Sequence, residues 1–124
     1  MCLGRILEHL QRAGFVTDVI TRGHEATHLM CRLTAASSEP HHFRRLDIHA
    51  VPITEYPLQI MYFTGSDQFN IECRVRAHKL GLHLNQSFLQ PRGELGQLGA
   101  PLPCHSERDV FDFLDMPYRD PSKR

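Results

Sequence analysis

The start of the chain carries an apolar pattern with helical spacing. Four apolar side chains recur three or four residues apart, at Leu3, Ile6, Leu7 and Leu10. Gly14 follows at the point where many helices end in a left-handed residue, a conformation that glycine adopts without steric cost. The pattern therefore predicts an amphipathic helix over residues 2–13.

Three strand-like runs come next. Residues 15–21 and 28–34 are rich in apolar and β-branched side chains, and the short turn between them predicts a hairpin. Residues 35–42 predict a loop, and the alternation over residues 43–51 predicts a third strand. One face of that strand would carry Arg45, Asp47 and His49, and the other face Leu46, Ile48 and Ala50.

Two helices are predicted in the next part of the chain. The run Thr-Glu-Tyr-Pro at residues 54–57 suits the first turn of a short helix that reaches about Phe63 and stops at a Thr-Gly-Ser turn. Ser66 can cap a second helix over residues 67–80, which Gly81 would end. This helix has an apolar stripe of Phe69, Cys73, Ala77 and Leu80, and a polar stripe of Asp67, Asn70 and Arg74.

The remaining residues predict short strands, turns and one more helix. Residues 82–84 alternate as a strand does, and a Gly- and Pro-rich loop runs over residues 91–103. Ser106 and Asp109 have the spacing of a capping box, ahead of the apolar residues Val110, Phe111 and Leu114. A polar tail is expected after that helix. Because helices are interleaved with strands in a mixed order, the sequence predicts an α+β fold.

The composition excludes several classes of protein. The 124 residues carry 14 basic and 14 acidic side chains, so there is no strongly basic tail for nucleic acid. No apolar run approaches the roughly 20 residues of a membrane span, and no signal segment follows Met1. The four cysteines are widely spaced, which predicts reduced thiols rather than a zinc site. Most basic residues are arginines, whose planar fork suits phosphates and base edges.

The segment His24-Glu25-Ala26-Thr27-His28 matches the H-E-x-x-H pattern. On a helix this pattern presents two imidazoles to zinc and a glutamate as the base. Here Gly23 precedes the segment, strand-like residues follow it, and no third ligand stands at a useful spacing. A hairpin turn with exposed histidines is therefore preferred to a zinc protease site.

Two further segments have both a structural and a functional interpretation. Arg45 and Asp47 on one strand face can form an ordinary ion pair, or the carboxylate can hold Mg²⁺ while the arginine holds a phosphate. One carboxylate is too few for a two-metal site. Residues 62–74 can be a plain helix, turn and capped helix. Alternatively, the polar stripe of the second helix can approach bases beside a glycine turn that lets the backbone come close.

Taken together, these segments resemble the C-terminal half of family X DNA polymerases, and the polymerase beta branch in particular rather than the longer-looped lambda branch. The matching motifs are Arg-Arg-Leu-Asp-Ile at 44–48, Tyr62 to Asn70 with Arg74, Leu84-Asn85, Pro-Leu-Pro at 101–103, and residues 106–112 and 118–121. The match has no gaps from Phe43 onward, and residues 3–34 match the end of the polymerase palm more loosely. The resemblance implies the C-terminal part of a palm over residues 1–52 and a thumb over residues 53–124.

The resemblance implies a role for each residue of the two segments. Asp47 would be the third metal-binding aspartate, placed to bind the catalytic Mg²⁺ and help deprotonate the primer hydroxyl, and Arg45 would contact the primer phosphate. Tyr62 and Phe63 would lie beside the incoming nucleotide and the primer end. The backbone at Gly65 would crowd a ribose hydroxyl, and the Gly65–Ser66 peptide bond is expected to be cis.

The helix after this turn would read the new base pair. Asp67 would pack against the new base, Asn70 would reach its minor-groove edge, Arg74 would probe the template strand, and Asn85 would contact DNA. Because minor-groove acceptors occur in every base pair, such contacts check the shape of the pair rather than its sequence.

Some family features are replaced or missing. His49, Gln86 and Ser87 stand where the beta branch has arginine, glutamate and tyrosine. That arginine and glutamate are thought to pair when the thumb closes, so their joint loss is either a coupled change or a sign of altered closing. The family's paired aspartates, D-x-D after a Gly-Ser turn, have no counterpart in the sequence. We therefore expect a fragment or truncated gene product that needs two Mg²⁺ ions in its complete form and is inactive alone.

The resemblance implies one of two functions, which belong to different classes. The first is the C-terminal portion of a beta-like polymerase that fills DNA gaps in base excision repair, acting on primer-template or gapped DNA and dNTPs. The second is a non-catalytic remnant that binds DNA or a partner protein through the thumb. A nuclear location is expected, with a mitochondrial one left open, and no membrane partner is expected. A longer reading frame with Gly-Ser and D-x-D would separate the two functions.

Overall fold

The structure is a computed structural model that describes residues 2–33 and 42–124. The chain divides into two compact units, Met1–Val51 (unit 1) and Pro52–Arg124 (unit 2). Each unit combines helices with a small antiparallel sheet, which confirms the α+β class. In the described residues, no helix is long and apolar enough to cross a membrane.

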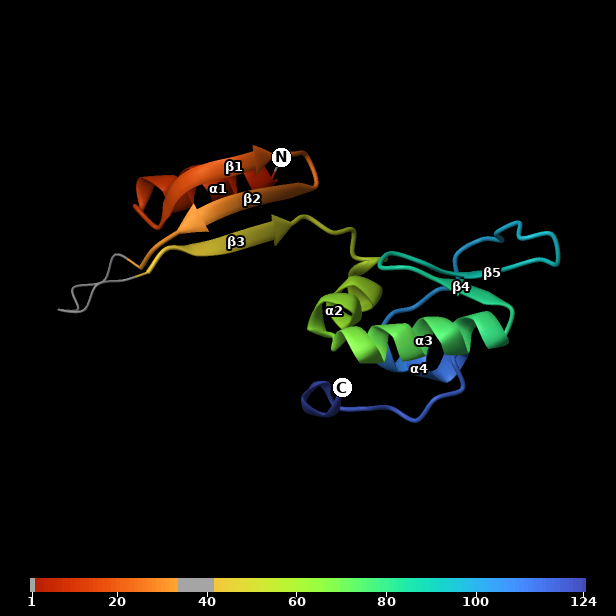
Figure 1. Cartoon of the computed structure of the whole chain (residues 1–124). Coiled ribbons are helices and arrows are strands. Elements are labelled where there is room, and N and C mark those ends of the chain that lie inside the picture. The colour runs from red at the N-terminus through yellow and green to blue at the C-terminus, as the bar shows by residue number, and fades with distance from the viewer. Residues whose placement is uncertain (1, 34–41) are drawn as a thin grey trace. The chain divides into compact units, whose positions relative to one another are not determined.

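Unit 1 is a three-stranded antiparallel sheet with one helix packed on a single face (Figure 1). Its elements are α1 (Cys2–Arg12), β1 (Val16–Arg22), β2 (Ala26–Cys31) and β3 (Arg44–His49). The strand order is β1-β2-β3, so the predicted helix and hairpin are confirmed. Gly14 takes a φ of 72° after α1, as its place in the sequence predicted. The predicted loop lies outside the described residues except for His42.

The core of unit 1 lies between α1 and the sheet. Leu7 from the helix packs with Val16 and Leu29 from the strands, all three buried. Residues of β2 alternate between buried and half-buried, because successive side chains of a strand point to opposite faces. In β3, Leu46 and Ile48 pack against this core, which leaves the predicted polar positions of that strand on the other face.

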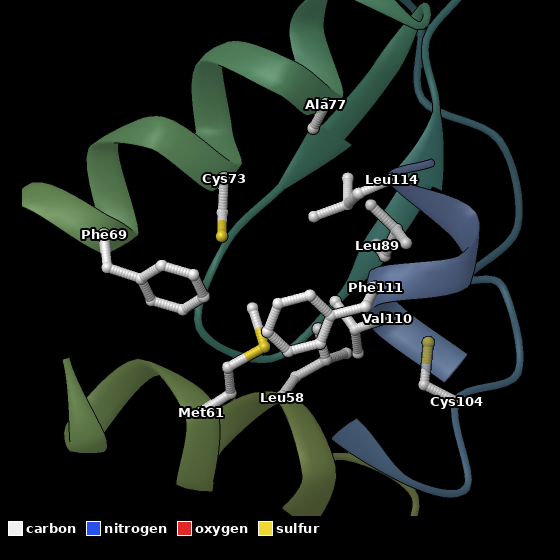
Figure 2. Close-up of a cluster of buried hydrophobic side chains, with 10 residues drawn as sticks. All are labelled: Leu58, Met61, Phe69, Cys73, Ala77, Leu89, Cys104, Val110, Phe111 and Leu114. Atoms are coloured by element: carbon white, nitrogen blue, oxygen red, sulfur yellow. The ribbon is translucent and has the colours of Figure 1, made fainter. Parts of the chain in front are cut away.

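Unit 2 holds three α-helices, a two-stranded sheet and a short terminal 3₁₀ helix. Its elements are α2 (Tyr56–Thr64), α3 (Asp67–Lys79), β4 (Leu82–Leu84), β5 (Leu89–Pro91), α4 (Glu107–Phe113) and η1 (Pro121–Lys123). Figure 2 shows the core that joins them, in which the aromatic rings of Phe69 and Phe111 lie 5.8 Å apart between α2, α3 and α4. The other buried members are Leu58, Met61, Cys73, Ala77, Leu89, Cys104, Val110 and Leu114.

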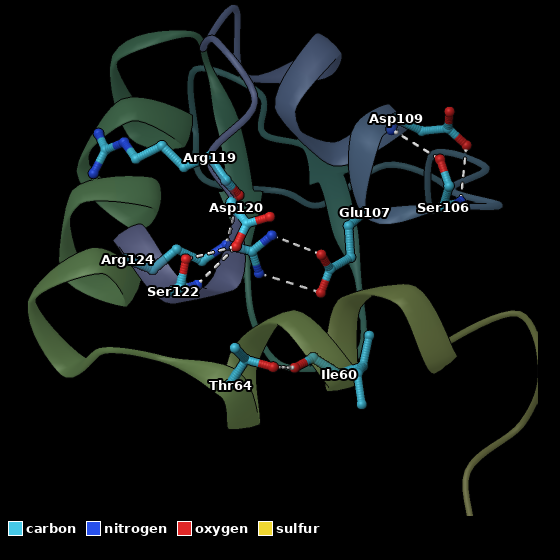
Figure 3. Close-up of polar contacts among 9 residues, drawn as sticks. All are labelled: Ile60, Thr64, Ser106, Glu107, Asp109, Arg119, Asp120, Ser122 and Arg124. Atoms are coloured by element: carbon cyan, nitrogen blue, oxygen red, sulfur yellow. Dashed lines mark hydrogen bonds and ion pairs between the residues drawn. The ribbon is translucent and has the colours of Figure 1, made fainter.

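The helix boundaries of unit 2 agree with the predicted caps. Ser66 Oγ accepts a hydrogen bond from the backbone N–H of Phe69 at the start of α3. Ser106 and Asp109 form a complete capping box at the start of α4 (Figure 3). Gly81 takes a φ of 71° after α3, a conformation that favours glycine. These three predictions are confirmed.

One sequence prediction for unit 2 is wrong. Leu80 is 41% exposed and does not extend the buried stripe of α3, because it is the C-cap residue and lies beyond the last helical turn. The polar tail is present and most of its residues are exposed, but the side chain of Arg124 is buried against α3 and α4.

The cysteines that the structure describes fully are free thiols. Cys31, Cys73 and Cys104 are buried and unpaired, which agrees with the predicted reduced state. Burial raises the pKa of the Cys73 and Cys104 thiols to about 11. These two thiols are structural core groups rather than reactive nucleophiles.

Candidate nucleic-acid and nucleotide site

The open face of the sheet in unit 1 presents a carboxylate held by two neighbours. Asp47 Oδ1 accepts a hydrogen bond of 2.8 Å from Arg45 Nε on the same strand. The same oxygen lies 2.9 Å from His28 Nδ1 on β2, because the strand register pairs His28 with Asp47. The His28 ring in turn meets the His49 ring edge-on, with centroids 6.2 Å apart. Sequence reasoning missed His28 here, since only the register of β2 against β3 reveals it.

The hydrogen bond between Arg45 and Asp47 favours the charged form of both side chains. The hydrogen bond from Arg45 lowers the pKa of Asp47, with a smaller contribution from His28, so the carboxylate is ionised at neutral pH. The hydrogen bond to Asp47 raises the pKa of Arg45. Both side chains remain partly open to solvent, with 62% of the Arg45 and 35% of the Asp47 side chain exposed. An ion pair this open is weak in water, so a metal ion or a phosphate could compete for either partner.

The donor set around Asp47 does not by itself fit a two-metal magnesium site. Mg²⁺ takes oxygen ligands in octahedral geometry, and a two-metal site needs carboxylates that reach both ions. Over residues 2–33 and 42–124, no three His, Cys, Asp or Glu side chains come together as a metal cluster. The H-E-x-x-H segment is likewise no zinc site there. His24 lies in the turn between β1 and β2, and His28 lies on a strand.

The turn between α2 and α3 has the backbone that the resemblance implied. The Gly65–Ser66 peptide bond is cis, and Gly65 has a φ of 68°. A Cβ added to Gly65 would meet nothing closer than the backbone nitrogen of Asp67 at 3.5 Å. The backbone conformation, and not a lack of space, therefore explains glycine at this position.

Four of the predicted site residues line one small hollow of unit 2. Tyr62 comes from α2, Asn70 and Arg74 come from α3, and Asn85 follows β4, around a floor that includes Leu58, Met61 and Leu84. We call this feature the Tyr62 hollow. Its free volume is about 10 Å³, which is room for roughly one water molecule. The hollow is therefore a shaped surface for the edge of a larger ligand and not a pocket that encloses a nucleotide.

Two contacts fix the side chains around the Tyr62 hollow. Asn70 Nδ2 donates a hydrogen bond of 2.9 Å to the carbonyl oxygen of Tyr62, which ties α3 to α2. The Arg74 guanidinium lies 5.5 Å from the centroid of the Tyr62 ring, a cation–π distance. Arg74 is itself exposed, so its charge is available to a ligand while the aromatic ring orients it.

Phe63 and Asp67 do not line this hollow, and Asn85 lines it with its amide oxygen already bonded. Phe63 is 55% exposed and meets the Tyr62 ring edge-on, with the ring centroids 5.1 Å apart, so it lies at the surface and not in the core. Asp67 is exposed in the first turn of α3. Asn85, which does line the hollow, accepts at Oδ1 from the backbone N–H groups of Ser87 and Phe88, so its amide oxygen is engaged within its own turn.

Gln59 is a residue of this region that the sequence did not single out. It lies on the buried face of α2, and its amide nitrogen donates to Ser87 Oγ at 3.2 Å and to Glu55 Oε2 at 3.3 Å. A polar residue on the buried face of a helix was the signal available in the sequence. Its partner Ser87 is 28 residues away, which no local pattern reveals.

The comparisons with known proteins agree with this geometry. The DNA polymerase beta thumb family matches residues 59–124, which contain the cis turn and all of the residues that line the Tyr62 hollow except Leu58. The chain belongs to the family X DNA polymerases. It is 35% identical to DNA polymerase lambda of Rattus norvegicus over 130 aligned residues, which cover 96% of the chain. It is 33% identical to DNA polymerase lambda of Arabidopsis thaliana over 87 residues, which cover 65% of the chain.

These relatives are much longer than the chain. The chain spans 22% of the length of the rat protein and 16% of the length of the plant protein. Both relatives are lambda polymerases, whereas the matching family is the beta thumb, so the preference for the beta branch stays a prediction. The resemblance to family X stated from the motifs is confirmed.

Proposed function

We propose that the chain contributes part of the palm (residues 1–52) and the thumb (residues 53–124) to a family X DNA polymerase. That enzyme carries out template-directed nucleotidyl transfer with gapped or primer-template DNA and dNTPs, and it fills gaps during base excision repair in the nucleus. The family match over residues 59–124 and the identity with the lambda polymerases support this proposal.

The observation that carries the proposal is the Tyr62 hollow beside the cis turn. Four of its lining residues, Tyr62, Asn70, Arg74 and Asn85, come from three segments, and the resemblance to family X implies a contact with DNA or nucleotide for each of them. An aromatic ring, an amide and a guanidinium are the groups that stack on bases and donate to minor-groove acceptors. In the proposal, Phe63, Gly65 and Asp67 contact the nucleotide from the flank of this hollow.

In the proposal, Asp47 and Arg45 are the palm residues that contact the metal ion and the primer. Asp47 is the metal carboxylate that this chain brings, and Arg45 holds the primer phosphate. The Mg²⁺ ions of such an enzyme supply charge neutralisation at the transferred phosphate, and they need carboxylates beyond Asp47. The proposal therefore assigns catalysis to a polymerase in which this chain is combined with a D-x-D segment.

A non-catalytic role is the second candidate. It is favoured by the engagement of Asp47 with Arg45 and His28. In this case the thumb surface binds DNA or a partner protein without chemistry. A reading frame that continues upstream through Gly-Ser and D-x-D would remove this candidate.

Arg74 provides the test of DNA binding. We expect Arg74→Ala to weaken binding of the chain to one-nucleotide-gapped DNA, measured by fluorescence anisotropy at fixed salt. A contact worth about 1–3 kcal/mol corresponds to a five- to 150-fold higher Kd. The matched control is Arg108→Ala. Arg108, on α4, is also exposed, and its guanidinium lies over the ring of Tyr118.

The two variants separate a specific contact from general charge. Each removes one positive charge and one cation–π contact from unit 2, so a purely electrostatic effect would weaken binding equally in both. The proposal expects a clear loss for Arg74→Ala and little change for Arg108→Ala. Equal losses, or no binding by the unaltered chain, would refute it.

A further inference from the structure

Gln59 is a buried amide among apolar side chains. It is 9% exposed, and its neighbours Leu58 and Met61 on the same side of α2 belong to the hydrophobic core. Burying an amide costs free energy unless its polar atoms are hydrogen-bonded. A residue of this kind is kept in a core when its hydrogen bonds hold other parts of the structure in place.

The amide nitrogen of Gln59 has two acceptors within hydrogen-bond distance. One is the carboxylate of Glu55, about one helical turn earlier, and the other is the hydroxyl of Ser87 in the turn between β4 and β5. Two acceptors in different directions fix the orientation of the amide plane. The amide therefore joins α2 to the β4–β5 turn by a short, directed link.

The turn that Gln59 holds is closed by Asn85. The backbone N–H groups of Ser87 and Phe88 donate to Asn85 Oδ1 at 2.8 and 2.7 Å, and the N–H of Asn85 donates to the carbonyl oxygen of Phe88. A displacement of Ser87 is transmitted to Asn85 through these bonds. The Ser87 hydroxyl, which accepts a hydrogen bond from Gln59, thus belongs to a residue two positions from Asn85, which lines the Tyr62 hollow.

Gln59, at the other end of this hydrogen bond, lies close in the helix to Tyr62, which forms the opposite wall of the hollow. Gln59 precedes Tyr62 by three residues, about one turn of α2. Tyr62 and Asn85 both line the hollow, and their separation is bridged by the Gln59–Ser87 hydrogen bond. This bond is therefore a directed contact between α2 and the β4–β5 turn, next to both walls of the hollow.

We propose that Gln59 is a positioning residue for DNA binding, which acts through Ser87 on Asn85 and keeps the Tyr62 hollow in shape for the edge of a base pair. This inference rests on the proposed function of the hollow. It also gives Ser87, one of the departures from the beta branch, a defined partner inside unit 2. The short Ser87 side chain places a hydroxyl within reach of the helix amide.

The test uses the full 124-residue chain with Gln59→Met, which keeps the length of the side chain but removes its donors. Ser87→Ala removes the acceptor, and the double variant completes the cycle. Gln90→Met is the matched control, because the Gln90 amide donates to the carbonyl oxygen of Gly99 in the same hairpin but does not line the hollow. The readouts are the Kd for gapped DNA and the hydrogen exchange of the Ser87 and Phe88 amides.

We expect Gln59→Met and Ser87→Ala each to raise the Kd about three- to tenfold and to speed exchange of these two amides by a similar factor. The Kd of the double variant should not exceed the higher of the two single-variant Kd values, because both substitutions remove the same hydrogen bond. Gln59→Met should have no further effect on affinity in an Asn85→Ala background. Gln90→Met should leave the Kd unchanged.

Other outcomes overturn the inference in distinguishable ways. If the unaltered chain binds DNA and Arg74→Ala weakens binding, but Gln59→Met binds as tightly as the unaltered chain, only the role of Gln59 fails. Unchanged exchange at Ser87 and Phe88, additive effects in the cycle, or equal acceleration of exchange throughout the core of unit 2 would also refute it. No binding by the unaltered chain would remove the proposed function, and the inference would fail with it.

Discussion

At the scale of single residues, the role of a charged side chain depends on its burial, which the sequence does not show. Arg124 belongs to the segment that the sequence predicts as a polar tail. In the structure its side chain is buried, and it forms two hydrogen bonds with the carboxylate of Glu107 (Figure 3). Its guanidinium also lies within 5.7 Å of the ring centroids of Phe69, Phe111 and Tyr118. The pairing with Glu107 raises the pKa of Arg124. Because these partners come from three different segments, no local pattern could reveal them.

We expect Arg124→Ala to destabilise unit 2 strongly. It would leave the carboxylate of Glu107 unpaired with only 19% of that side chain exposed, and it would remove a filled space between three aromatic rings. Breaking a buried pair of this kind costs about 3–5 kcal/mol of unfolding free energy. The measurement is urea denaturation followed by circular dichroism.

Arg119→Ala is the matched control for this substitution. Arg119 also pairs with a carboxylate, that of Glu72, but 45% of the Glu72 side chain is exposed. Exposed pairs contribute about 0.2–1 kcal/mol, so this variant should unfold at nearly the same urea concentration as the unaltered chain. Similar losses for both variants would mean that the burial of Arg124 does not set its contribution.

At the scale of elements, the features that local chemistry determines were predictable and those set by partners were not. Ser66, Gly81 and the pair Ser106 and Asp109 mark helix ends through bonds or dihedral angles within a few residues, so the sequence alone places them. The strand β5 has three residues and no pattern of its own. It exists because its register pairs it with β4, a contact that residue types in a short window do not encode.

The capping box of α4 predicts how stability changes with pH. Hydrogen bonds from the N–H of His105 and from Ser106 lower the pKa of Asp109. A carboxyl group with a lowered pKa in the folded state stabilises that state above its ordinary pKa of about 4, and this contribution is lost as the pH falls through the lowered value. We therefore expect Asp109→Asn to lower the melting temperature at pH 7, with a difference that shrinks as the pH falls below about 4.

The melting temperatures are to be measured by circular dichroism from about pH 7 to about pH 2.5, a range that extends well below the ordinary pKa of the carboxyl group. Asp112→Asn is the matched control, because it removes a carboxylate from the same helix outside the capping box. A difference between Asp109→Asn and the unaltered chain that stays constant with pH would show that the charge of Asp109 does not stabilise the box.

At the scale of the whole chain, the sequence predicted the family better than the contacts that connect distant residues. The order of motifs indicated family X, and Tyr62, Asn70, Arg74 and Asn85 do line one hollow. The links that hold the sites were not predictable, since His28 reaches Asp47 across a strand pair and Gln59 reaches Ser87 over 28 residues. Side chains that act directly on a ligand leave a trace in residue type, whereas those that support them depend on tertiary contacts.

The incomplete donor set predicts that binding and catalysis separate in this chain. We expect it to bind gapped DNA but to incorporate no nucleotide with Mg²⁺ and dNTPs, because Asp47 alone cannot supply the carboxylates of a two-metal site. The measurement is extension of a labelled primer in gapped DNA, with a family X polymerase that contains D-x-D as the positive control. Asp47→Ala should leave the Kd for DNA nearly unchanged, as should Asp18→Ala, a carboxylate on the exposed part of β1. Template-directed extension that Asp47→Ala abolishes and Asp18→Ala preserves would show instead that the chain completes an active site by itself.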